Sequence, residues 1–178
     1  IVPADYNQTV QATLAIAEWE GPVYLRFGRP SVPVFVPENA TFQIGKAEVL
    51  TTGKDVSVIA CGHLVWTAIE AQKVLRSEGI SVEVINMHTI KPLDEAAVIA
   101  SAQKTGCVVT AEEHMRNGGL GDAVAQVLMQ HHPCPQEYVA VNDRFGESGP
   151  PMELMKKYGL GVEDIISAIK RAIKRKKL

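Results

Sequence analysis

The chain has 178 residues, of which 46% are hydrophobic and 21% charged, and its formal net charge at pH 7 is −2. This composition is typical of a folded globular protein and excludes a largely disordered chain. The charge disfavours a nucleic-acid partner, because such binders usually carry a basic excess. No apolar run approaches the roughly 20 residues that cross a bilayer, so no membrane partner is expected.

The first thirty residues predict an incomplete unit. Residues 1–3 have the pattern of a strand that begins upstream, so the chain is interpreted as a fragment of a longer protein. Asp5 is a predicted N-cap, with Gln8 three residues later, for a helix over residues 7–19. A Gly-Pro pair ends this helix, and residues 23–27 predict a strand. The segment is therefore interpreted as the remnant of an α/β domain.

A proline-rich connection follows. Pro30, Pro33 and Pro37 exclude a helix or a central strand here. Residues 30–45 are therefore predicted to form a semi-rigid link between two domains.

Regular alternation of strands and helices begins after this link. Segments rich in Val and Ile predict strands at residues 56–61, 82–87, 107–111 and 138–141. Amphipathic segments predict helices at residues 63–77, 94–104, 118–131 and from 163 onward. Residues 48–50 could add a short antiparallel strand at an edge of the sheet. The predicted fold class is α/β: a three-layer, mostly parallel sheet with helices on both faces.

The three cysteines, Cys61, Cys107 and Cys134, are far apart and form no CxxC pair. Lone cysteines of this kind are usually buried small hydrophobic residues of reduced compartments. We therefore expect free thiols and a cytoplasmic location.

Ligands of such sheets usually bind beyond the carboxyl ends of the strands. The polar residues expected there are His63, His88, Glu112, Glu113, His114, Asn142, Asp143 and Glu147. Glu112, Glu113 and His114 have no HExxH or triad spacing, and adjacent strand residues point to opposite faces. Structural hydrogen bonds are the favoured interpretation, and no metal site and no catalytic residue is predicted.

Two further patterns favour structural roles. The glycine loop 118–121 precedes a helix and is a weak match to an anion site, so close packing of helix on strand is the favoured interpretation. The basic residues of the tail 170–177 are interpreted as the solvated face of a helix, since cations are favoured at a helix C-terminus.

Arg29 follows the predicted strand 23–27, beside Gly28 and near Arg26. A guanidinium in this position is suited to bidentate binding of phosphate. A surface arginine without a function is the stronger interpretation on these residues alone.

Five segments together resemble the transketolase family. Residues 21–29 (GPVYLRFGR) resemble the end of its pyrimidine-binding domain. The C-terminal domain is resembled by residues 55–62 (DVSVIACG), 86–94 (NMHTIKPLD), 112–121 (EEHMRNGGLG) and 145–149 (FGESG). The resemblance covers nearly the whole chain and is closest to transketolase and its split-subunit relatives. It implies a pyrimidine-domain remnant with linker at 1–36 and a C-terminal domain at 37–178.

The resemblance also implies an activity. Members of the family use thiamine diphosphate and Mg²⁺ to transfer a two-carbon ketol unit between sugar phosphates, as in the pentose phosphate pathway. The chain contains no GDG motif for the diphosphate and the metal, so no cofactor-binding residue and no metal ligand is assigned to it. Only Arg29 matches a family functional position, the arginine that binds the phosphate of the substrate. Pro30 stands where many transketolases have a polar residue.

The resemblance implies a fragment that is inactive alone and serves dimerisation and packing. Its expected partners are a second copy of itself as a homodimer, the upstream or N-terminal transketolase portion, and a sugar phosphate substrate. Three alternatives remain: a stand-alone interaction or regulatory module, a β-subunit fragment of a 2-oxo-acid dehydrogenase, and a deoxyxylulose-phosphate synthase fragment.

Overall fold

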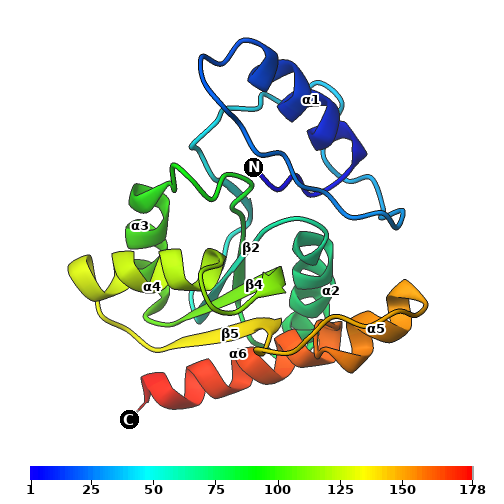
Figure 1. The fold of residues 1–178 in the computed structure, drawn as a ribbon. Helices are drawn as coiled ribbons and strands as arrows, with labels where there is room; N and C mark the ends of the chain where they lie inside the picture. The colour runs from blue at the N-terminus through cyan, green and yellow to red at the C-terminus, as the bar shows by residue number, and fades with distance from the viewer. Residues whose placement is uncertain (178) are drawn as a thin grey trace.

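The computed structural model describes residues 1–177 and has a five-stranded sheet at its centre (Figure 1). The strands, in the spatial order β1-β3-β2-β4-β5, are β1 (Glu48–Thr51), β2 (Val56–Ala60), β3 (Val82–Asn86), β4 (Val108–Met115) and β5 (Gln136–Val141). β2 to β5 are parallel, and β1 is the antiparallel edge strand beside β3. The predicted α/β fold class is confirmed.

Helices cover both faces of the sheet. The helices of the described chain are α1 (Tyr6–Ala17), α2 (Leu64–Ser77), α3 (Glu95–Thr105), α4 (Leu120–His131), α5 (Pro151–Lys157) and α6 (Val162–Lys176). α2 and α6 pack with Val58 in one core cluster, whereas α3 and α4 pack with Ile59 in the other. Because successive residues of a strand face opposite sides, the single strand β2 contributes to both clusters.

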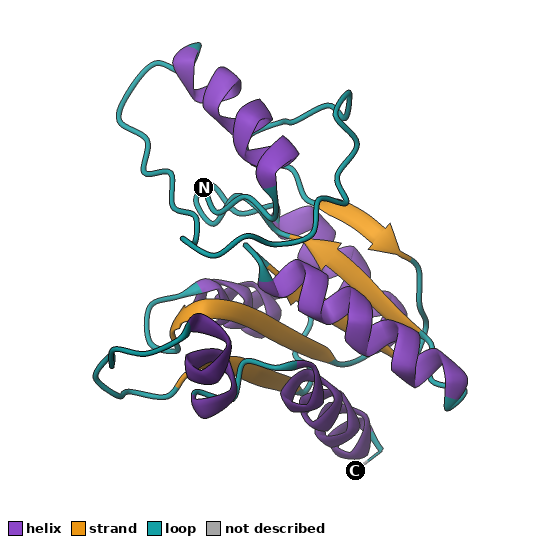
Figure 2. Ribbon diagram, turned by 90° about the vertical axis from the view of Figure 1, so that its right-hand side faces the viewer, coloured by secondary structure: helices purple, strands orange, loops and turns teal. Residues whose placement is uncertain are grey.

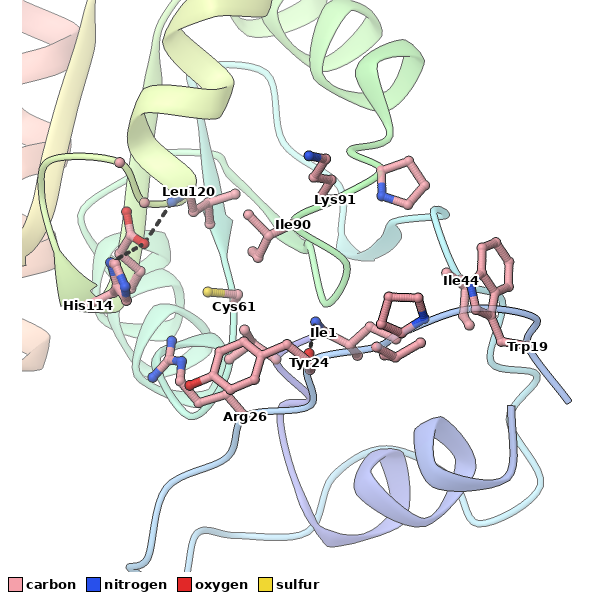
Figure 3. A pocket seen from close by; sticks show the side chains of 17 residues that line it. Ile1, Trp19, Tyr24, Arg26, Ile44, Cys61, Ile90, Lys91, His114 and Leu120 are labelled. Atoms are coloured by element: carbon pink, nitrogen blue, oxygen red, sulfur yellow. Dashed lines mark hydrogen bonds and ion pairs between the residues drawn. The ribbon is translucent and has the colours of Figure 1, made fainter. Parts of the chain in front are cut away.

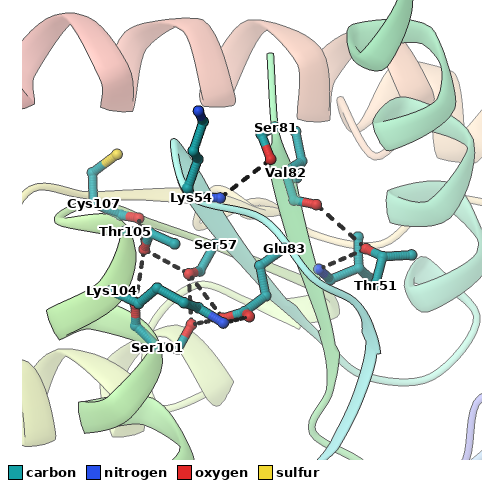
Figure 4. A network of polar contacts seen from close by, with 11 residues as sticks. Thr51, Lys54, Ser57, Ser81, Val82, Glu83, Ser101, Lys104, Thr105 and Cys107 are labelled. Atoms are coloured by element: carbon teal, nitrogen blue, oxygen red, sulfur yellow. Dashed lines mark hydrogen bonds and ion pairs between the residues drawn. The ribbon is translucent and has the colours of Figure 1, made fainter. Parts of the chain in front are cut away.

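A polar network interrupts the second face (Figure 4). Glu83 of β3 is 1% exposed, and its carboxylate accepts hydrogen bonds from Ser101 and Lys104 of α3. The Ser57 hydroxyl, in turn, lies 2.7 Å from the Thr105 hydroxyl. A buried carboxylate is costly unless it is paired and hydrogen-bonded, so this network fixes α3 in register on the sheet.

Residues 1–36 lie at one side of the sheet, with α1 standing apart from the other helices (Figures 1 and 2). Asp5 is the N-cap as predicted: its Oδ1 accepts the Gln8 N–H at 2.9 Å. Its other oxygen, Oδ2, accepts the N–H groups of Phe35 and Val36, each at 2.7 Å. One buried carboxylate therefore starts α1 and also holds the proline-rich link against it.

One local prediction was wrong, and one helix was missed. Residues 23–27 are not a strand of a sheet: in the described chain the Tyr24 carbonyl and the Arg26 N–H bond only with Ile1, at 2.8 and 2.9 Å. A strand needs a neighbouring ladder, and Ile1 offers a single residue of one. α5 was not predicted, because its seven residues begin at Pro151 and bury no side chain.

Two further observations concern the cysteines and the length of the helices. Cys61, Cys107 and Cys134 are free. None of the helices within residues 1–177 is long and apolar enough to cross a membrane.

Candidate functional site

The carboxyl ends of β2, β3, β4 and β5 face residues 1–3 and 22–30, and two cavities lie along this junction. The Arg26 cavity, of about 560 Å³, is lined by residues 22–24, by Arg26, and by residues at or just after the ends of β2, β3 and β4. The Arg29 cavity, of about 480 Å³, is lined by residues 29–30, by the ends of β2, β4 and β5, and by residues 144–160. The position agrees with the general location of ligands in parallel sheets.

The Arg26 cavity is mainly apolar (Figure 3). Arg26 and His114 lie at one end of it, and Trp19 and Ile44 lie at the other. The Arg26 guanidinium donates to the Glu113 carbonyl at 3.0 Å, so part of its hydrogen-bonding capacity serves the chain itself. Burial raises the pKa of the Cys61 thiol, which also lines the cavity, to about 12, so this thiol is not a nucleophile at neutral pH.

Glu112, at the end of β4, has a structural role. Its two carboxylate oxygens accept the N–H groups of Leu120 and Gly121, at 2.7 and 2.8 Å, at the start of α4. Burial raises the pKa of this carboxyl, and the two backbone donors act against that shift. The positive end of α4 is therefore already occupied by a carboxylate of the same chain.

This contact also explains the glycine loop. A Cβ at Gly119 would lie 2.3 Å from Glu112 Oε2, and a Cβ at Gly121 would lie 2.4 Å from the Tyr138 ring. The glycines thus allow α4 to approach β4 and β5 closely, which confirms the predicted packing role. The Gly118 N–H is bound as well, by Asp122 Oδ2 at 2.7 Å.

Glu113 faces the other way and approaches His63, whose Nε2 lies 2.9 Å from Glu113 Oε2. The contact does not have the geometry of a hydrogen bond, because His63 Nε2 has no hydrogen-bond partner in the described chain. It is an ion pair when the histidine is protonated. The His63 contact lowers the pKa of Glu113, which is therefore ionised at neutral pH. As predicted, the adjacent residues Glu112 and Glu113 do not converge on one site.

Arg29 is exposed and lies at the rim of the Arg29 cavity. Arg29 also lines a third cavity, of about 570 Å³, whose walls come mainly from residues 3–9 and 27–34. Among residues 1–177, no carboxylate forms an ion pair with its guanidinium and no acceptor takes a hydrogen bond from it. Of the two arginines in this segment, Arg29 is therefore the one with its donors available.

Sequence analysis did not single out Arg144 and Tyr158, which line the same cavity as Arg29. Arg144 stands one residue before the FGESG segment, and this position next to a family motif was the available signal. The Tyr158 hydroxyl donates to the Phe145 carbonyl at 2.8 Å and so holds the loop after β5.

The other predicted polar residues do not form a common site. His88 is buried, with its Nδ1 3.0 Å from the Thr89 hydroxyl, and burial lowers its pKa to about 4. His114 lines both cavities and contacts its neighbouring carbonyl at Met115. Asn142 and Asp143 are exposed in the loop after β5, and Glu147 pairs with Lys157 at 2.6 Å.

The basic tail is more than a solvated face. Arg171 and Arg175 of α6 both bind Glu137 of β5, at 2.9 and 2.8 Å. Burial acts to raise the pKa of Glu137, but the two arginines outweigh it and lower the value. These cations therefore attach α6 to the edge of the sheet.

The residues present do not fit a thiamine diphosphate and Mg²⁺ site. Within residues 1–177, no group of three or more His, Cys, Asp or Glu side chains is placed to hold a metal ion. Three of the acidic residues at the strand ends already have partners in the chain: Glu112 accepts backbone N–H groups, Glu113 contacts His63, and Glu147 pairs with Lys157. No step through the cofactor is therefore assigned to residues of this chain.

Comparison with known proteins decides the family. The family model "Transketolase, C-terminal domain" matches residues 45–165. The chain belongs to the transketolase C-terminal domain family. The resemblance of the five segments is confirmed, and the matched region contains the whole sheet.

The relatives include subunits of split transketolases. The chain is 42% identical over 174 residues to the 6-deoxy-6-sulfo-D-fructose transketolase subunit SqwH of Clostridium sp. (strain MSTE9), covering 98% of this chain and 54% of that protein. It is 34% identical over 174 residues to human transketolase, covering 96% of this chain and 28% of that enzyme. This chain spans about half the length of the split subunits that it matches.

A solved structure is similar over the same range. A chain described as "Split gene transketolase, inactive beta4 tetramer" superposes with a TM-score of 0.95 at 46% sequence identity. The match covers 98% of this chain and 57% of the solved one. The segment 1–36 is included in this match, so the C-terminal domain and the segment before it share one arrangement with that relative.

Proposed function

We propose that this chain is the C-terminal portion of a thiamine-diphosphate-dependent transketolase, most closely of a split-subunit type, and that Arg29 binds the phosphate of the sugar substrate. The observation that carries the proposal is the match of 98% of the chain to about half of a split transketolase subunit. Similarity is lower to 1-deoxy-D-xylulose-5-phosphate synthase, at 34% over 168 residues of the enzyme from Heliobacterium modesticaldum.

The division into residues 1–36 and 37–178 is part of the proposal. Several large apolar side chains of the first segment are more than half exposed: Tyr6 at 70%, Leu14 at 66%, Tyr24 at 77% and Phe27 at 60%. Apolar surface gathered on one segment favours an interaction site. Its proposed occupant is the rest of a pyrimidine-binding domain from the upstream portion of the enzyme.

In this proposal the chain does not carry the cofactor chemistry. Thiamine diphosphate supplies the electron sink for carbon–carbon bond cleavage, and it is held elsewhere in the parent enzyme together with Mg²⁺. The residues of this chain orient the phosphate end of the substrate and pack the assembly. The choice of sugar is open, since the relatives include sulfo-sugar and apulose-4-phosphate enzymes.

Reconstitution tests the proposal. The full-length gene product, combined with its diphosphate-binding partner subunit or domain, is expected to transfer a ketol unit from a ketose phosphate to an aldose phosphate. The 178 residues alone are expected to show no transfer and no heat of binding with thiamine diphosphate and Mg²⁺ in calorimetry. Micromolar binding by the isolated chain, or no transfer by the combined proteins with any phosphorylated ketose, would contradict the proposal.

The proposed function also includes self-association of the chain. The family resemblance supports a homodimer formed through the C-terminal domain. The description of the solved relative as a tetramer of its beta subunit also supports self-association. A stable two-fold contact is expected to bury more than about 1,000 Å². Light scattering of the purified protein across a concentration series measures this directly, and a monomer at every concentration would contradict the proposal.

A further inference from the structure

Arg144 lies in the loop after β5 and lines the same cavity as Arg29. The two arginines are 115 positions apart in the chain and come from the two proposed domains. Like Arg29, Arg144 forms no ion pair or side-chain hydrogen bond within the described residues 1–177. The cavity is therefore approached by two guanidinium groups whose donors remain available.

The carboxylates of this cavity do not neutralise the two arginines. Glu113 contacts His63 at 2.9 Å, and Glu147 pairs with Lys157 at 2.6 Å. Glu147 thus has a cationic partner, and Glu113 has one in His63 when this histidine is protonated. The charge left over at the cavity is positive and comes from Arg29 and Arg144, which suits a dianion.

The loop that carries Arg144 is held in place. The Tyr158 hydroxyl donates to the Phe145 carbonyl at 2.8 Å, and the Asp143 N–H donates to the Val141 carbonyl at 3.2 Å. The Phe145 side chain is 96% exposed, so it points away from the protein while its neighbour Arg144 lines the cavity. A guanidinium on a pinned loop is better oriented for a ligand than one on a free loop.

From this geometry we propose that Arg144 binds the phosphate of the sugar-phosphate substrate together with Arg29, so that the phosphate site spans both domains. The inference rests on the proposed function and assigns the C-terminal domain a part in substrate recognition. Two guanidinium groups offer a phosphate more donors than one, which favours phosphorylated over unphosphorylated sugars.

Kinetics of the reconstituted enzyme test this role. Arg144→Ala is expected to lower kcat/KM for a phosphorylated aldose by roughly 10- to 30-fold, mainly through KM, as for a lost charge-assisted hydrogen bond. The unphosphorylated aldose of the same length is expected to change by less than about twofold. Arg144→Lys should recover part of the loss. Arg76→Ala, an exposed arginine near the end of α2, is the matched control and should behave as the parent enzyme.

A binding measurement separates this inference from the proposed function. Inorganic phosphate is titrated into the ¹⁵N-labelled protein, and the side-chain Nε–Hε signals of the arginines are followed by NMR. Saturable shifts of both Arg29 and Arg144, each weakened by alanine substitution of the other, are expected. If the enzyme proves inactive but both signals respond, the proposed function fails and the phosphate site stands. If Arg29 alone responds, or if Arg144→Ala affects both aldoses equally, the role of Arg144 is refuted.

Discussion

Gln8 and Asn86 are 78 positions apart, yet the Asn86 side-chain amide donates to the Gln8 carbonyl oxygen at 3.0 Å and both side chains are fully buried. Glu48 completes the cluster by accepting from Gln8 Nε2 at 3.2 Å and from Asn86 Nδ2 at 3.1 Å. The Gln8 cluster, formed by these three residues, joins α1 to β1 and β3. Residues 1–36 are thus attached to the sheet by a buried polar contact.

Substitution of Gln8 tests this attachment. Gln8→Ala is expected to lower the free energy of unfolding by about 2–3 kcal/mol, because it leaves the buried Ala4 N–H without its acceptor and removes one of the two acceptors of the Asn86 amide. Urea denaturation measures the loss, and amide exchange should become faster in α1. Gln11→Ala on the same helix is the control, since Gln11 bonds only to exposed carbonyls of the link and should cost less than about 1 kcal/mol. Equal losses for both variants would refute the attachment.

Glu112 and Gly119 are expected to be coupled. Gly119→Ala should destabilise the protein by about 2 kcal/mol or more, because the new methyl group would overlap the Glu112 carboxylate. Glu112→Ala should cost about 1–3 kcal/mol by leaving the N–H groups of Leu120 and Gly121 unpaired. The double variant is expected to lose less than the sum of the two single losses, as measured by a double-mutant cycle of thermal or urea unfolding. Strict additivity would mean that the two residues do not contact each other.

The polar network of Figure 4 depends on Lys104. Lys104→Met removes the cationic partner of the buried Glu83 carboxylate and should cost about 2–3 kcal/mol of unfolding free energy at pH 7. Addition of Glu83→Gln to Lys104→Met should recover a large part of that loss, since no buried charge then remains. Failure of the second substitution to recover stability would show that Lys104 acts through its packing alone.

His88 predicts a loss of stability in acid. Burial lowers the pKa of the His88 imidazole in the folded state to about 4, below its ordinary value of 6.5. The unfolded chain therefore takes up the proton first, and stability decreases as the pH falls from 6.5 towards 4, by at most about 3 kcal/mol. His88→Phe keeps a ring against Phe42 and should flatten this part of the stability profile. His131→Gln, at an exposed site, should leave the profile unchanged.

Arg29→Ala is expected to act on the substrate and leave cofactor affinity unchanged. Loss of one guanidinium–phosphate pair corresponds to about 1.5–3 kcal/mol, or roughly 10- to 150-fold in kcat/KM for a phosphorylated substrate. Arg29→Lys should restore only part of the loss, because lysine keeps the charge without the planar fork. The measurement is steady-state kinetics of the reconstituted enzyme with phosphorylated and unphosphorylated acceptors. An equal loss for both would give Arg29 a structural role.

The sequence predicts the sheet well because each of its strands carries a local signal. Runs such as Val56–Ala60 and Val82–Asn86 are rich in the β-branched residues Val and Ile, and Asp94 and Gly106 mark the ends of α3 as capping residues. The contacts that define the site come from residues far apart in the chain. Nothing in the sequence near Arg144 shows that the loop after β5 returns to Arg29, because that proximity is produced by the parallel strand order.

Glu112 and Glu113 also show that the sequence predicts the direction of a side chain but not its contacts. Periodicity predicts that Glu112 and Glu113 face opposite ways, which the structure confirms. It does not identify their partners, since Leu120, Gly121 and His63 are brought to β4 by helix packing. A structural role was therefore predictable for the pair, and its particular hydrogen bonds were not.

The carboxylate of Asp5, which binds both α1 and the proline-rich link, has a consequence for the order in which the chain folds. Residues 1–36 leave the ribosome before any strand of the sheet, but the Gln8 cluster is complete only when β1 and β3 exist. Until then, bonds within the segment can close it on itself: Asp5 binds residues 8, 35 and 36, and the Asn7 side chain donates to the Val36 carbonyl. Residues 1–36 can therefore close on themselves before the sheet is made, whereas their attachment to the sheet through the Gln8 cluster waits until β3 has been synthesised.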